Sequence, residues 1–64
     1  MTRREECKIL ASRLGLTTNA CLAWMNANRI DAITDLIGRW PDLDHAQAMQ
    51  RAGDEIWAHH MATQ

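Results

Sequence analysis

The stretch LASRLGLTTNACLAW, residues 10–24, predicts two helices joined by a tight turn. Leu10 and Leu14 repeat at helical spacing before the turn, and Cys21 and Trp24 restart the apolar pattern beyond it. Since buried residues at this spacing share one face of a helix, both helices present an apolar face to a common core. The rest of the chain is best understood as packing around this corner.

Local signals mark where the two helices meet. Gly15 follows the last apolar residue of the first helix, and glycine is favoured there because it adopts the left-handed conformation without a steric penalty. Thr17 or Thr18 can then cap the second helix by accepting a hydrogen bond from a backbone N–H. We therefore expect a helix from about residue 3 to residue 14 and a second from about residue 18 to residue 27.

Two further helices are expected in the C-terminal half. A stripe of Ile and Leu residues ending at Trp40 predicts a core helix over residues 30–40, which must stop before Pro41. The acidic turn that follows offers Asp42 or Asp44 as the cap of a last helix over residues 45–62. The composition agrees, because the chain has no Tyr or Phe, three Gly and one Pro, and no stretch alternates like a strand.

The corner resembles the helix-turn-helix of phage and bacterial repressors. Ala11 lies four residues before the turn glycine Gly15, an aliphatic Leu16 follows it, and Cys21 and Trp24 stand where that family buries anchors of its recognition helix. The expected fold is all-α, a small four-helix domain over residues 1–64. Residues 1–40 would form a helix-turn-helix-like core, and residues 42–62 would add a C-terminal amphipathic helix.

The resemblance implies a small sequence-reading DNA-binding regulator of the phage or plasmid repressor type, with duplex DNA as its partner. Residues 1–30 carry five basic and two acidic side chains, a net charge of +3, whereas residues 31–64 carry a net charge of −4. The predicted recognition helix contains no Lys or Arg, which is a departure from the family pattern. The residues that would contact phosphates or bases are Lys8, Arg13, Thr17, Thr18, Asn19, Asn26 and Arg29.

The chain is expected to form a homodimer through its last helix. The apolar residues of this helix spread over more than one stripe, so a three-helix core would leave some of them uncovered. A symmetric partner would cover that surface and place two recognition helices about one DNA turn apart. The residues expected at this interface are Met49, Gly53, Ile56, Trp57 and Met61.

A helical protein-interaction module or inhibitor is the alternative function, and it fits the acidic C-terminal half and the absence of cations on the second helix. Leu14-Gly15-Leu16 also resembles the Met-Gly-Phe type loop of ubiquitin-associated domains, although a fourth helix is left over here. These two readings, a DNA-binding protein and a protein-binding module, remain open at the level of sequence.

Chemistry at an active site is not expected. Cys7 and Cys21 are separated by 13 residues and lie on the apolar stripes of successive helices, so they are read as buried thiols and not as a zinc clamp. Glu55 and His59 are four residues apart, which is an ordinary surface pair on a helix. The chain is therefore predicted to be a cytoplasmic non-enzyme without cofactor or metal, and without a signal peptide or membrane span.

Overall fold

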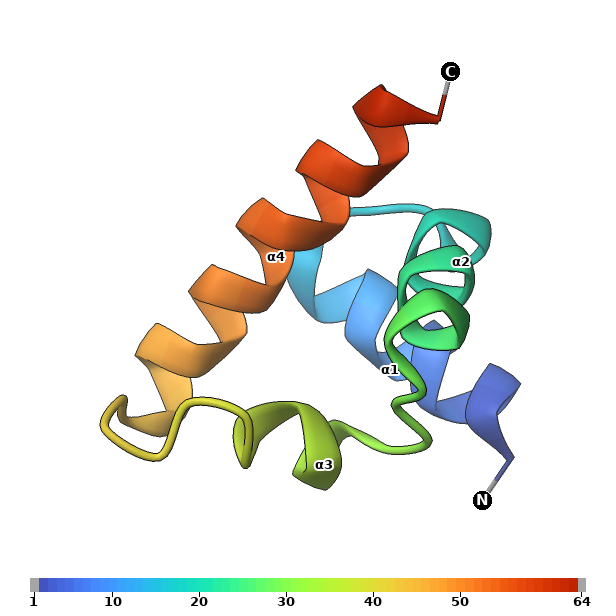
Figure 1. Cartoon of the computed structure of the whole chain (residues 1–64). Coiled ribbons are helices and arrows are strands. Elements are labelled where there is room, and N and C mark those ends of the chain that lie inside the picture. The colour runs from blue at the N-terminus through green and yellow to red at the C-terminus, as the bar shows by residue number, and fades with distance from the viewer. Residues whose placement is uncertain (1, 64) are drawn as a thin grey trace.

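The computed structural model of the chain describes residues 2–63, which form four helices and no strand (Figure 1). The helices are α1 (Arg3–Leu14), α2 (Thr18–Asn28), α3 (Ile33–Ile37) and α4 (His45–Ala62). The predicted all-α fold is confirmed. In Figure 1, α4 runs along one edge of the molecule, and α1, α2 and α3 all lie on the same side of α4.

The corner between α1 and α2 forms as its sequence predicts. Gly15 ends α1 in the left-handed region with φ 69°, and the N–H of Leu16 donates to the carbonyl of Ala11 at 3.0 Å. Of the two possible caps of α2, Thr17 fills the role, because its hydroxyl accepts from the N–H of Ala20 at 3.2 Å. The turn is thus closed at both sides by short-range hydrogen bonds.

The third helix is much shorter than predicted, and the expectation of a helix over residues 30–40 is wrong at both ends. Ile30 belongs to the C-terminal cap of α2 and does not start the third helix. Arg29 is left-handed with φ 56°, and the N–H of Ile30 donates to the carbonyl of Met25 at 2.9 Å. After Ile37 the chain continues as turns that lead to Pro41. Burial of the apolar stripe did not require a continuous helix.

The last helix begins and ends as predicted. Asp44 caps it in a full capping box, with its carboxylate accepting from the N–H of Gln47 at 2.8 Å and its own N–H donating to the Gln47 side chain at 3.1 Å. One face of α4 closes the core between the helices. The fully or nearly buried apolar residues of the described chain are Cys7, Leu10, Ala11, Ala20, Cys21, Trp24, Met25, Ile30, Leu36, Ala48, Met49, Ala52 and Ile56.

Gly53 lies in the middle of α4, where glycine weakens a helix relative to alanine. The close approach that the glycine suggests is made by a side chain, since a Cβ at this position would lie 3.4 Å from Cδ2 of Leu14. That separation is an ordinary van der Waals contact, so Gly53→Ala should stabilise the fold by about 0.4 to 1 kcal/mol. Thermal unfolding followed by circular dichroism measures this, and a lower melting temperature would show that Leu14 leaves no space.

Candidate functional site

Two large apolar side chains at the C-terminal end of α4 face solvent. Trp57 is 55% exposed and Met61 is 51% exposed, whereas the other large apolar side chains of the described chain are buried or half-buried. The two residues are four apart on α4 and therefore lie next to each other on one helical face. They form a small apolar surface on the outside of the fold.

A pocket of about 110 Å³ lies beside this surface, and we call it the corner pocket. The α1–α2 turn and the start of α2 form one wall, and the C-terminal half of α4 forms the other. Its lining residues are Gly15, Leu16, Thr17, Ala20, Ile56, Trp57 and His60. A dry cavity of about 150 Å³ holds a benzene molecule, so the corner pocket suits one aliphatic side chain.

Sequence reasoning did not identify the corner pocket, although it singled out most of its residues for other reasons. Leu16 was expected only as the aliphatic residue after the turn glycine, and His60 was assigned no role. In the structure the ring centroids of Trp57 and His60 lie 6.1 Å apart with a tilt of 41° between the rings. The pocket exists because the turn packs against the last two turns of α4, and periodicity within one helix does not specify such a contact.

The predicted DNA-contacting residues do not form one continuous surface. All of them are exposed except Thr18, which is half-buried. Lys8 and Arg13 are five residues apart on α1, which corresponds to about 140° around the helix, so they lie on different flanks. The hydroxyl of Thr17 is engaged in capping α2. Asn19 and Arg29, at opposite ends of α2, remain exposed to solvent.

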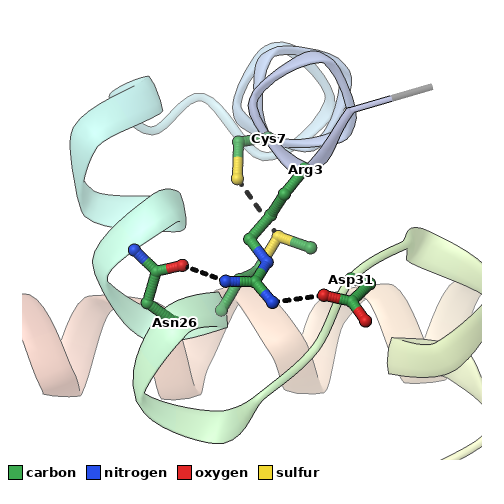
Figure 2. A network of polar contacts seen from close by, with 5 residues as sticks. Arg3, Cys7, Asn26 and Asp31 are labelled. Atoms are coloured by element: carbon green, nitrogen blue, oxygen red, sulfur yellow. Dashed lines mark hydrogen bonds and ion pairs between the residues drawn. The ribbon is translucent and has the colours of Figure 1, made fainter.

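Asn26 belongs to an intramolecular network (Figure 2). Its side-chain carbonyl accepts a hydrogen bond from Nη1 of Arg3, and Nη2 of the same guanidinium pairs with the carboxylate of Asp31. Arg3 therefore links the start of α1 to the end of α2 and to the segment before α3. This arginine contributes less to a positive surface than the net charge of the N-terminal half indicates.

The dimer interface predicted on the last helix must be corrected at three positions. Met49 and Ile56 are buried in the chain's own core, and Gly53 packs against a side chain of α1. Gly53 is half-buried, and Trp57 and Met61 are the members of the predicted set that are exposed. The solvent-accessible surface is 4152 Å², close to the roughly 4,200 Å² expected of a folded monomer of this mass. The single chain is therefore as compact as a typical monomer.

Both cysteines are free, buried thiols, as their positions on the apolar stripes predict. Desolvation raises the pKa of the Cys7 thiol, against an opposing effect of Arg3, and raises the pKa of the Cys21 thiol to about 11. The Sγ atom of Cys7 lies 3.2 Å from Sδ of Met25. At neutral pH both groups of the free chain are therefore protonated thiols.

Stability should fall as the pH rises from about 9 to about 11. The Cys21 thiol ionises near its ordinary value of 9.0 in the unfolded chain but only near 11 in the fold, so the unfolded state binds fewer protons in this interval. The slope for one thiol reaches about 1.4 kcal/mol per pH unit. Urea unfolding at pH values of about 8 and 10.5 measures the loss. A Cys21→Ala variant should lose less, and an equal loss would contradict this origin.

Among the residues that the structure describes, no helix combines the length and apolar character needed to cross a membrane. No family model matches the chain, and comparisons with curated proteins and with solved structures return no similar protein.

Proposed function

We propose that this chain is a small helical protein-interaction module that binds its partner through the corner pocket together with Trp57 and Met61. The observation that supports the proposal is the exposure of these two large side chains beside a preformed apolar pocket. Tryptophan is among the residues that contribute most to binding energy at protein interfaces, because it buries a large area with few rotatable bonds. Large apolar side chains that gather on one exposed face are typical of sites that bind other proteins.

The shape of the pocket limits the partner. A peptide or helix that inserts one aliphatic side chain would fill the corner pocket and lay its flanking residues over the Trp57 indole. The area of such a contact is well below the roughly 800 Å² per partner of a standard stable interface. We therefore expect a short segment of a partner protein to bind with modest affinity.

Selection of random peptides displayed on phage against the immobilised chain tests the proposal. Enriched peptides should share an aliphatic residue, and Trp57→Ala should weaken their binding at least tenfold. The matched control is Gln50→Ala, an exposed residue on α4 outside the pocket, and it should bind like the unchanged chain. Peptides that bind the Trp57→Ala variant equally well would place the binding surface elsewhere and overturn the proposal.

Duplex DNA is the second candidate partner, and two features favour it. The turn between α1 and α2 spans residues 15–17, within the roughly 3–4 residues of a helix-turn-helix corner, and Asn19 and Arg29 are exposed on α2 and at its end. In this reading the chain acts as a homodimeric regulator, with Trp57 and Met61 at the dimer contact. Sedimentation at tens of micromolar protein would test the dimer, and a monomer under those conditions would refute it.

A mobility-shift assay on pooled random DNA, at about 50 and 200 mM salt, separates the two functions. Arg29→Gly is the informative variant, because glycine relieves the left-handed backbone at this position and the fold is retained. It should weaken DNA binding and reduce the salt dependence by about one phosphate contact. Absence of any shift at the lower salt and micromolar protein would refute DNA binding.

A further inference from the structure

Three sulfur-containing side chains gather where α1 packs on α2. Cys7 comes from α1, and Cys21 and Met25 come from α2, and none of the three is exposed to solvent. Cys21 and Met25 are four residues apart, so they lie on the same face of α2. The Sγ atom of Cys7 reaches this face and lies 3.2 Å from Sδ of Met25. We call these three residues the sulfur cluster.

The half-buried guanidinium of Arg3 lies near the cluster. Arg3 is four residues before Cys7 on the same face of α1. Figure 2 shows the guanidinium held between Asn26 and Asp31 through its two terminal nitrogens. Its third nitrogen, Nε, is shielded from solvent and has no hydrogen-bond partner among the described residues. A buried donor without an acceptor is unfavourable, and an anionic group bound near Arg3 would reduce that cost.

We propose that Cys7, Cys21 and Met25 form a binding site for copper(I), with Arg3 offsetting the charge of the complex. Thiolate and thioether sulfurs are the soft ligands that copper(I) prefers. Zinc fits this site less well, because structural zinc takes four ligands, and the described residues contain no group of three or more His, Cys, Asp or Glu placed to hold a metal. Cys7 and Cys21 supply two sulfur ligands, and Met25 supplies the third.

Binding is a ligand exchange without electron transfer. Each thiol loses its proton to solvent and forms a sulfur–copper bond, and the Met25 thioether donates a lone pair. The bonds from copper to the bicinchoninate nitrogens break and the free chelator leaves, so the copper stays in the +1 state. One copper(I) ion and two thiolates carry a net charge of −1, which the Arg3 guanidinium faces. Because the sulfurs are buried, the ion must enter through a transient separation of α1 from α2.

The test is an anaerobic titration of the full chain with copper(I) against the chelator bicinchoninate, together with thermal unfolding. We expect one copper per chain and a higher melting temperature, because an ion that binds the folded state stabilises it. Cys21→Ala should abolish chelator-resistant binding, and Met25→Leu, which keeps the core apolar, should weaken it by about 10-fold or more. Arg3→Gln should weaken it by about 10- to 100-fold with the stoichiometry unchanged.

Met49→Leu is the matched control, since Met49 is a core methionine of α4 outside the sulfur cluster, and it should leave copper affinity unchanged. Three results would overturn the proposal: no binding in competition with bicinchoninate, equal binding by the Met25→Leu variant, or a melting temperature that falls with copper. The last would mean that copper binds thiols of the unfolded chain. None of these measurements depends on the corner pocket, so the proposed protein interaction stands or fails separately.

Discussion

Replacement of Trp24 by alanine is expected to lower the free energy of unfolding by about 3 to 5 kcal/mol. Trp24 is only 2% exposed and belongs to the core between α2 and the rest of the fold. The guanidinium carbon of Arg39 lies 5.9 Å from its ring centroid and 5.8 Å from that of Trp40, so the indole is also covered by a cation. The variant loses the apolar contacts and leaves a cavity.

A domain of this size has only about 5 kcal/mol of stability in total, so most of the Trp24→Ala protein should be unfolded at room temperature. Urea unfolding followed by far-ultraviolet circular dichroism measures the loss without relying on tryptophan fluorescence. Trp24→Phe is the control, because it keeps most of the apolar area and should retain more of the stability. A folded Trp24→Ala variant with an unchanged midpoint would place the side chain outside the core.

Ile56→Ala is expected to lower the free energy of unfolding by about 2 to 5 kcal/mol, whereas Trp57→Ala, one residue further along α4, should change it by about 0.5 kcal/mol or less. Ile56 is fully buried, and Trp57 is 55% exposed. The smaller residue should thus dominate stability and the larger one should dominate partner binding. Residue size alone would predict the larger loss of stability for the Trp57→Ala variant.

Urea unfolding under identical conditions measures the stability of the Ile56→Ala and Trp57→Ala variants. Binding of the selected peptides to each variant measures the effect on partner binding. Ile56→Val serves as the intermediate step, with an expected loss of about 0.5 to 1.5 kcal/mol. If Trp57→Ala were as destabilising as Ile56→Ala, Trp57 would belong to the core, and the proposed interaction surface would lose its main support.

The sequence by itself determined where α1, α2 and α4 begin and the form of the corner between α1 and α2. These features depend on interactions between residues a few positions apart. The caps at Thr17 and Asp44 and the left-handed Gly15 each satisfy backbone groups within one turn of the helix. Helical periodicity likewise identified Trp24 as a core residue, because its neighbours on the stripe are close in sequence.

Tertiary structure decided which part of a wide apolar band is buried. On α4 the band contains both Ile56 and Trp57, and only the positions of α1 and α2 determine that the first enters the core and the second lines the corner pocket. The same holds for the pairing of Arg3 with Asn26 and Asp31, which joins residues more than twenty positions apart. Contacts of this kind depend on how helices pack in space, and the period of one helix carries no information about the direction from which its neighbours approach.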